Sequence, residues 1–363
     1  MGKKNIAFII YSLDSGGAER VVATLANALS LYYNVTIVTL VKGESIYPLN
    51  NSVKILYCLD TIPNKINAII SLKNNCRLYS NLKSVLRKQS IELTLSFMTT
   101  SNVLAILASK SIGIPCVISE RSNPYVYTHN IIWNQLIKWT FPKSNYLVVQ
   151  SQLVKDYYKA LMPSNKIVIL PNPLSNELVK LKNQSIERKN IILNVGRLDE
   201  NKAQDLLIKA FSNLPNDDWE LFFVGDGPLL ATYSTLVHQL GVSEKIKFIG
   251  KTNDVSIYYN QSKIFAFTSK SEGFPNALIE AMFFEIPCIS TDCPSGPSEL
   301  IVDGLNGYLI PVNDQIALER QLLKLMKDSD LCKTFGNNAF KTASMYEASY
   351  VINQWKHLID DVI

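Results

Sequence analysis

The chain has 363 residues, of which 47% are hydrophobic and 18% are charged, and its formal net charge is +5. This length and composition predict two folded domains, and they exclude both a small disulfide-stabilised module and a long disordered polymer. The six cysteines are scattered and include no Cys-x-x-Cys pair, which indicates reduced thiols in a cytoplasmic protein.

Short apolar runs typical of buried strands alternate with helical patterns in the first half of the chain. The runs span residues 5–11, 35–41, 53–57, 93–97, 116–119, 146–149 and 167–170, with helical patterns at 18–29, 102–111 and 152–161. Strands that are apolar throughout and joined by helices predict a parallel sheet covered on both faces. The first run is too short for a signal peptide, and no run approaches the ~20 apolar residues of a membrane span.

A polar stretch, residues 172–190, interrupts this alternation, and we interpret it as an interdomain linker after a first domain of residues 1–171. The pattern then resumes, so residues 191–345 predict a second doubly wound domain. Residues 346–363 predict an amphipathic helix that packs back toward the first domain. Because open parallel sheets bind ligands beyond the carboxyl ends of their strands, we expect function in post-strand loops at a central cleft.

Charge is distributed unevenly between the two halves. Residues 1–170 contain 18 Lys and Arg against 7 Asp and Glu, whereas residues 171–363 contain 18 against 24. The basic half predicts a negatively charged partner for one domain only, such as an anionic membrane surface or a diphosphate. The sequence contains no recognisable nucleic-acid-binding motif, so we do not expect nucleic acid as a partner.

Two glycine-containing loops follow predicted strands. Gly16 and Gly17 open the helical pattern at 18–29, where a backbone without Cβ atoms lets an anion approach a helix N-terminus. A simple tight turn between strand and helix is an equal alternative. Gly225 and Gly227 follow the run at 220–224 and also allow close backbone approach, although glycines at this spacing suit many turns.

Two cations follow the predicted strand at 191–195. Arg197 and Lys202 stand five residues apart, and together they can hold a diphosphate without a metal, one as a planar fork and the other as a point charge. The alternative is a solvated charged turn.

The most specific loop is residues 272–280. The backbone N–H groups of Phe274, Asn276 and Ala277 stand at a predicted helix start, where they can bind phosphate. Glu272 in the loop and Glu280 two turns into the helix can accept hydrogen bonds from sugar and ribose hydroxyls. For Glu280 alone, the alternative is an exposed helical glutamate.

Together these motifs resemble those of the family 4 retaining glycosyltransferases, and the resemblance covers nearly the whole chain. Residues 11–25 are most similar to bacterial N-acetylgalactosamine transferases that extend undecaprenyl-diphosphate-linked glycans. The resemblance implies an α/β GT-B fold, in which two doubly wound Rossmann-like domains face a central cleft. The first would bind the acceptor and the second the nucleotide sugar.

The resemblance also implies roles for single residues. Arg197 and Lys202 would neutralise the donor diphosphate without a metal or other cofactor, and Glu272 would contact the donor sugar. Glu280 would bind the ribose, and Lys251 would lie against the base. Many relatives carry a His after the strand that ends here at Ser119; this chain has Glu120 and Arg121 instead, so we expect there either an acceptor site or a structural ion pair.

The expected reaction is retaining transfer of a hexose or N-acetylhexosamine, best N-acetylgalactosamine, from a UDP-sugar to a lipid-linked oligosaccharide. The product would serve bacterial surface polysaccharide, such as O-antigen or capsule, or a glycoprotein glycan. The alternatives are a GDP-mannose-dependent mannosyltransferase, a nucleotide-sugar epimerase of the same fold, and an inactive glycan-binding partner subunit. An inactive subunit would tend to lose the donor residues that this chain keeps.

A helix predicted at residues 72–88 carries a basic edge beside a wide apolar arc. At ~100° per residue, its cations fall within an arc of roughly 140°; they are Lys73, Arg77, Lys83, Arg87 and Lys88. We predict that this edge binds an anionic membrane at the inner face of the cell membrane, or the acceptor diphosphate. The alternative is a helix that packs on the sheet with a solvated basic rim.

Overall fold

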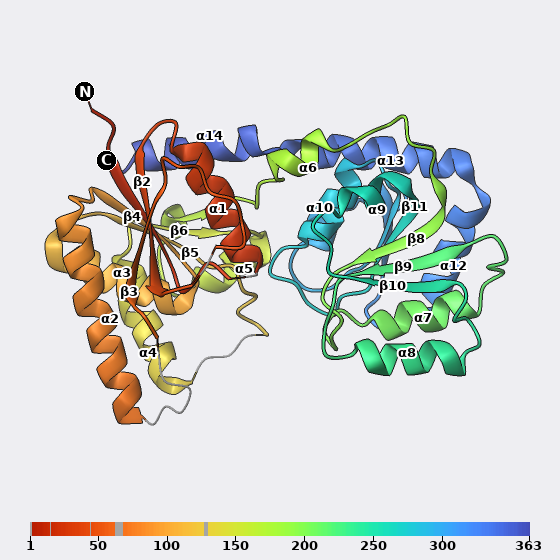
Figure 1. Cartoon of the computed structure of the whole chain (residues 1–363), viewed down its shortest axis with the longest axis horizontal. Helices are drawn as coiled ribbons and strands as arrows, with labels where there is room; N and C mark the ends of the chain where they lie inside the picture. Colours follow the sequence, from red (N-terminus) through yellow and green to blue (C-terminus); the bar gives the residue numbers. More distant parts are fainter. Residues whose placement is uncertain (1, 15, 44, 62–67, 127–129) are drawn as a thin grey trace. The chain divides into compact units, whose positions relative to one another are not determined.

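The computed structural model describes residues 2–14, 16–43, 45–61, 68–126 and 130–363. These fold into two compact units (Figure 1). Unit 1 comprises Met1–Pro173 together with Ser349–Ile363, and unit 2 comprises Leu174–Ala348. Unit 1 carries 19 Lys and Arg against 9 Asp and Glu, a net charge of +10, whereas unit 2 carries 17 against 22, a net charge of −5.

A seven-stranded parallel sheet forms the centre of unit 1, in the order β3-β2-β1-β4-β5-β6-β7. Its interior strand β1 is fully buried from Ile6 to Ile10, which is why its sequence is apolar on both faces. In register, Phe8 of β1 lies between Ile37 of β2 and Leu95 of β4. The strands are β1 (Asn5–Ile10), β2 (Asn34–Val41), β3 (Lys54–Leu59), β4 (Leu93–Phe97), β5 (Cys116–Ser119), β6 (Tyr146–Val149) and β7 (Ile167–Ile169).

Helices cover both faces of this sheet. One face, which includes Ala7 and Ile9, packs against α2 (Ala68–Lys88), α3 (Thr99–Ile112), α4 (Ile131–Thr140) and α5 (Gln152–Tyr158). On the opposite face lies α14 (Ala348–Asp360), and α1 (Gly17–Leu29) connects β1 to β2. The chain moves from β1 to β2 and β3 toward one edge of the sheet, and from β4 to β7 toward the other edge. Because the crossovers are right-handed, this reversal places the helices that follow β3 on the opposite face from α1.

The helix α14 completes the core of unit 1, although it follows unit 2 in the sequence. The Trp355 ring is fully buried and stacks on Phe97 at a centroid distance of 5.8 Å, and Phe97 stacks on Phe8 at 5.9 Å. At the end of the helix, the Tyr33 hydroxyl donates to Asp360 Oδ1 at 2.5 Å. Both ends of the described chain therefore belong to unit 1.

Unit 2 contains a six-stranded parallel sheet in the order β10-β9-β8-β11-β12-β13. One face packs against α7 (Gln204–Ser212), α8 (Leu230–Gln239) and α12 (Gln315–Lys327). The other packs against α6 (Asn176–Lys180), α10 (Asn276–Phe283), α11 (Pro297–Leu300) and α13 (Ser329–Ala343), with α9 (Ser256–Gln261) beside them. The strands are β8 (Lys189–Val195), β9 (Glu220–Val224), β10 (Ile246–Gly250), β11 (Ser262–Phe267), β12 (Cys288–Thr291) and β13 (Gly307–Ile310).

The interpretation of residues 172–190 as a linker is wrong for most of that stretch. Leu174 and Leu178 are buried in the core of unit 2; Leu174 directly precedes the Ser175 N-cap of α6, and Leu178 lies within that short helix. The Asn183 N–H donates to Asn260 Oδ1 at 2.8 Å, and Lys182 pairs with Glu285 at 2.8 Å. The polar composition hides two apolar anchors, and residues from Leu174 onward belong to unit 2.

No helix in the described part of the chain is long and apolar enough to cross a membrane.

Candidate active site

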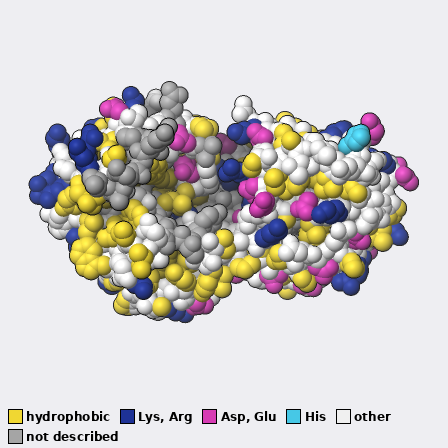
Figure 2. Space-filling model, turned by 90° about the horizontal axis from the view of Figure 1, so that it is seen from below, with side chains coloured by type: hydrophobic (Ala, Val, Ile, Leu, Met, Phe, Trp, Pro, Cys, Tyr) yellow, Lys and Arg dark blue, Asp and Glu magenta, His cyan; other side chains and the backbone are white. Residues whose placement is uncertain are grey.

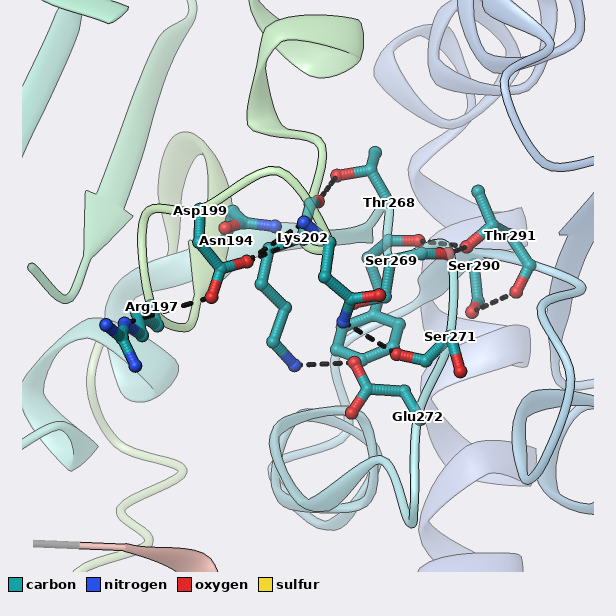
Figure 3. A network of polar contacts seen from close by, with 12 residues as sticks. Asn194, Arg197, Asp199, Lys202, Thr268, Ser269, Ser271, Glu272, Ser290 and Thr291 are labelled. Atoms are coloured by element: carbon teal, nitrogen blue, oxygen red, sulfur yellow. Dashed lines mark hydrogen bonds and ion pairs between the residues drawn. The ribbon is translucent and has the colours of Figure 1, made fainter. Parts of the chain in front are cut away.

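Two residues from separate loops meet beyond the carboxyl ends of β8 and β11. Lys202 Nζ lies 2.5 Å from Glu272 Oε1 (Figure 3). Both side chains are mostly enclosed, with exposed fractions of 23% for Lys202 and 10% for Glu272. The ammonium also lies 5.3 Å from the centre of the Phe267 ring. The structure thus joins two residues that are 70 positions apart in the sequence.

Hydrogen bonds within the β8–α7 loop fix the position of Lys202. Asp199 Oδ1 accepts from the backbone N–H groups of Asn201 at 3.1 Å and of Lys202 at 3.0 Å, which closes an Asx turn. Ala203 then takes the left-handed conformation, with φ +48°, and caps α7. Lys202 is therefore held at both its amide and the residue that follows it.

The same loop is tied to the loop that follows β11. The Thr268 hydroxyl donates to the Lys202 carbonyl at 2.8 Å, and the Asn201 amide donates to the Ser271 carbonyl at 2.8 Å. The Lys270 N–H donates to the Asn201 carbonyl at 2.7 Å. These bonds, most of which Figure 3 shows, hold the ammonium and the carboxylate in one geometry without help from a ligand. Asn201 and Thr268 were missed at the sequence level because short polar side chains in loops carry no distinctive spacing.

Arg197 does not join the Lys202–Glu272 pair. Its side chain is 71% exposed, and its Nε lies 3.9 Å from Asp199 Oδ2. In Figure 3 it points away from Glu272. A contact this long and exposed contributes little stability, so the guanidinium can turn toward an anion at low cost.

Gly225 and Gly227 serve the packing of neighbouring loops. A Cβ atom on Gly225 would lie 2.0 Å from the Gly196 carbonyl oxygen, and one on Gly227 would lie 2.2 Å from the Leu198 carbonyl oxygen. Gly225 also has φ +139°, which favours glycine. The close backbone approach predicted here therefore occurs, and it is to the loop that carries Arg197.

The loop before α10 uses part of its donor capacity internally. The Asn276 N–H donates to the Phe274 carbonyl at 3.0 Å, so a phosphate would have to compete with this bond for the amide, and its role in donor binding stays a prediction. The Phe274 ring is 8% exposed and lies 5.9 Å from the Tyr346 ring, which makes it an anchor for the loop. Ala277 follows in the first turn of α10.

Glu280 is buried, with an exposed fraction of 5%, so the alternative of an exposed helical glutamate is wrong. The Tyr259 hydroxyl donates to Glu280 Oε2 at 3.0 Å. A carboxylate of this kind, held in a fixed position on a regular helix, is suited to accept hydroxyl hydrogen bonds. Tyr259 gave no signal in the sequence because its partner lies 21 residues away.

The remaining donor-site predictions are spread over both units. Lys251 is exposed directly after β10. Gly16 and Gly17 lie in unit 1 at the start of α1, where the Tyr47 hydroxyl donates to the Gly16 carbonyl at 2.9 Å. The backbone of Gly16 is extended, a conformation open to any residue.

Glu120 follows β5 and is almost completely buried, at 2% exposed. Its carboxylate accepts from Asn102 Nδ2 at 2.7 Å and from the Thr99 hydroxyl at 3.0 Å. Burial raises the pKa of Glu120 to about 7, against the opposing effect of these two hydrogen bonds and of the nearby Arg121 charge. The side chain also lines a recess of about 580 Å³ between α4 and α5.

Arg121 binds aromatic rings and amides within unit 1. Its guanidinium carbon lies 5.0 Å from the centre of the Phe97 ring and 5.9 Å from that of Trp355. Nη1 also contacts Asn172 Oδ1, and with Gln150 oriented to satisfy its hydrogen bonds, Gln150 oxygen accepts from Nη1 at 2.7 Å. The carboxylate of Glu120 is instead held by Thr99 and Asn102 of α3. Glu120 and Arg121 therefore have different partners, although they are neighbours in the sequence.

The basic residues predicted along residues 72–88 lie on α2. Leu78, Leu82 and Leu86 are buried against the sheet. Leu72, which the sequence also predicts in the apolar arc of this helix, is 67% exposed, so the predicted arc is wrong at that residue. Lys73 and Arg77 are exposed, and Lys83 lies 5.9 Å from the Tyr79 ring. Helix α2 thus packs through one apolar stripe and keeps its cations outward.

Within the described residues, no three His, Cys, Asp or Glu side chains converge as a metal site would require.

Two family profiles together match almost the whole chain. Residues 15–178 match the family described as "Glycosyltransferase Family 4", and residues 176–342 match "Glycosyl transferases group 1".

Two proteins of Campylobacter jejuni are similar to this chain over nearly their full length. It is 32% identical to a GalNAc-alpha-(1->4)-GalNAc-alpha-(1->3)-diNAcBac-PP-undecaprenol alpha-1,4-N-acetyl-D-galactosaminyltransferase, over 98% of both chains. It is 31% identical to an N-acetylgalactosamine-N,N'-diacetylbacillosaminyl-diphospho-undecaprenol 4-alpha-N-acetylgalactosaminyltransferase, over 95% of this chain and 96% of the other. Among solved structures, Anabaena HepE in complex with UDP superposes with a TM-score of 0.80 at 18% identity, covering 98% of this chain and all of that one.

Proposed function

Because the chain belongs to the family 4 glycosyltransferases and has their GT-B fold, we propose that it is a retaining transferase that uses a UDP-sugar. The observation that carries this proposal is the contact between Lys202 and Glu272. It places one cation and one carboxylate side by side at the carboxyl edge of a parallel sheet, where a donor needs both charge neutralisation and a hydroxyl acceptor.

The pair suits the bond that has to break. During transfer, the bond between the anomeric carbon and the β-phosphate oxygen breaks, a bond to the acceptor hydroxyl oxygen forms, and the proton of that hydroxyl passes to the departing phosphate oxygen. Negative charge builds on the leaving diphosphate. Lys202 has three N–H donors, so it can hold a phosphate oxygen while it keeps its contact with Glu272. Arg197 is exposed and can add a second, bidentate contact.

We propose that this transfer needs no metal ion. The support is chemical: two side-chain cations stand on the loop that follows β8, one of them anchored by the Asp199 turn. Cations that are fixed before the reaction stabilise developing charge without reorganisation.

The acceptor that we propose is a lipid-linked oligosaccharide, and the sugar is N-acetylgalactosamine. Support comes from the two Campylobacter transferases, whose names describe transfer of this sugar to undecaprenol-diphosphate-linked glycans. The net charge of +10 on unit 1 favours an acceptor that carries a diphosphate at an anionic membrane. Acceptor recognition would then fall to unit 1 and the Glu120 region, and the enzyme would work at the inner face of the cell membrane, with Lys73, Arg77 and Lys83 toward the lipid.

Product analysis tests the proposal directly. The purified chain would be incubated with a panel of UDP- and GDP-sugars, with and without an undecaprenyl-diphosphate-linked GalNAc glycan. We expect acceptor-dependent UDP release and a product one N-acetylhexosamine heavier, with an α-anomeric signal by NMR. Nucleotide release without an acceptor would indicate an epimerase or hydrolase, GDP-mannose consumption would indicate a mannosyltransferase, and a β-linked product would exclude retention.

A further inference from the structure

The outer face of α4 is apolar and exposed. Ile131 is 76% exposed, Ile132 is 66% and Trp139 is 56%. Tyr125 and Val126, in the loop before the helix, are also exposed. Figure 2 views the molecule from below and shows apolar side chains gathered over unit 1, with Lys and Arg side chains at their edge. Large apolar side chains exposed together on one side of a helix mark an interaction site.

This face is separate from the face that builds the core. Ile137 is buried, and Trp133 and Leu136 pack against the same core cluster. At ~100° per residue, Ile131, Ile132 and Trp139 fall within an arc of about 100° on the other side of the helix. A helix that is apolar on both sides needs a second apolar environment, and its outer side has none within the described part of the chain.

Lysine side chains border the exposed face of α4, whereas the carboxylates nearest to it in the sequence, Glu120 and Asp156, line the recess between α4 and α5. Lys143 Nζ lies 3.2 Å from the centre of the Trp139 ring, and Lys138 is exposed on the helix beside it. Aromatic rings flanked by lysine are suited to the boundary between lipid headgroups and acyl chains.

We propose that the outer face of α4 inserts into an anionic lipid bilayer, with Ile131, Ile132 and Trp139 among the acyl chains and Lys138 and Lys143 at the headgroups. The location is independent of donor chemistry, but its purpose rests on the proposed function, because a lipid-linked acceptor has to be met at a membrane. A second copy of the chain fits this face less well: a helix of about 15 Å offers far less than the roughly 800 Å² per partner of a stable dimer.

Vesicle binding tests this inference. The full chain would be cosedimented with vesicles of phosphatidylcholine containing about 30 mol% phosphatidylglycerol. We expect Ile132→Ser/Trp139→Ser to lower the partition coefficient by at least ~10-fold, because it removes two of the three inserted side chains. The matched control is Ile316→Ser on α12, which is also 76% exposed but lies in unit 2, and it should bind as the wild type does. Far-UV circular dichroism would establish that both variants are folded.

A spectroscopic measurement places the insertion on Trp139. Lipids brominated near the headgroup should quench wild-type fluorescence, and Trp139→Phe should lose most of that quenching while Trp219→Phe keeps it. Equal vesicle binding by the α4 variant and the control would overturn the inference, and so would a dimer in light scattering that the α4 variant dissolves.

A second experiment tests the proposed function independently of membrane binding. Transfer to a short-chain acceptor in solution should be equal in wild type and the α4 variant. Transfer without vesicle binding would refute only the membrane surface, whereas vesicle binding without transfer to either acceptor would refute only the proposed function.

Discussion

Units 1 and 2 share one architecture but use the ends of their strands differently. In unit 2 the loops after β8 and β11 are tied to each other, and they leave Lys202 and Glu272 as a partly open pair. In unit 1 the residues after β5 turn inward: Glu120 is held by α3, and Arg121 lies against Phe97 and Trp355. A polar residue after a strand therefore indicates a site only where its partners leave it access to a ligand.

The largest expected effect concerns the inward construction of unit 1. Trp355→Ala should lower the free energy of unfolding by about 3–5 kcal/mol, because it empties the stack between α14 and the sheet. Tyr350→Ala, an exposed position on the same helix, is the control and should change little. Urea unfolding would measure the loss of stability, and hydrogen exchange would show which backbone amides lose protection. If the amides that lose protection lay in unit 2 instead of unit 1, α14 would not belong to the core of unit 1.

The open pair of unit 2 should matter for rate rather than for folding. Lys202→Ala and Glu272→Gln should each lower kcat by at least ~10²-fold, because in the proposed function both act on the reacting sugar diphosphate. Lys209→Ala removes an exposed lysine paired with Asp205 on the neighbouring helix α7, and it should leave kcat unchanged. The rates would be measured by UDP release. Wild-type rates for both site variants would show that the Lys202–Glu272 pair is structural, as the residues after β5 in unit 1 are.

The buried Glu120 should make the stability of unit 1 depend on pH. Its raised pKa means that the folded chain binds a proton between the unfolded value of ~4.3 and about 7. This contribution to stability is complete below pH ~4.3 and is lost as the pH rises through about 7, by roughly 3–4 kcal/mol in all. Urea unfolding at pH 5 and pH 8 should show a steeper decline for wild type than for Glu120→Gln. Parallel declines would show that Glu120 is ionised throughout.

The smallest expected effect is that of chelation. Excess EDTA should change turnover by less than about twofold, since the proposed charge neutralisation comes from Arg197 and Lys202. Complete loss that Mg²⁺ or Mn²⁺ restores would show that the diphosphate is held by a metal.

Much of this fold could be predicted because its strands are buried on both faces. A run such as Ile6–Ile10 has no solvent-facing position, so its composition alone indicates a strand in a covered sheet. Helix α6 could not be predicted this way, since only Leu174 and Leu178 anchor that segment in a polar stretch.

The sequence could predict which residues belong to the candidate site, but it could not predict which of them are in contact. Lys202 and Glu272 meet because β11 lies beside β8, a neighbourhood that follows from the strand order rather than from the sequence. The burial of Glu280 and its bond to Tyr259 likewise depend on how α10 packs on α9 and the sheet. The inward turn of Arg121 required a partner from the last helix of the chain.

The place of α14 also sets an order of events during synthesis. A ribosome adds ~5–20 residues per second, so roughly 10–35 s pass between the emergence of Pro173 and that of Ser349. During that time the Phe8 and Phe97 rings lack the Trp355 ring that covers them, and the whole of unit 2 emerges before the last helix of unit 1 does. A circular permutant that begins at Leu174 would make both units continuous, and it should shorten the interval in which the nascent first sheet depends on chaperones.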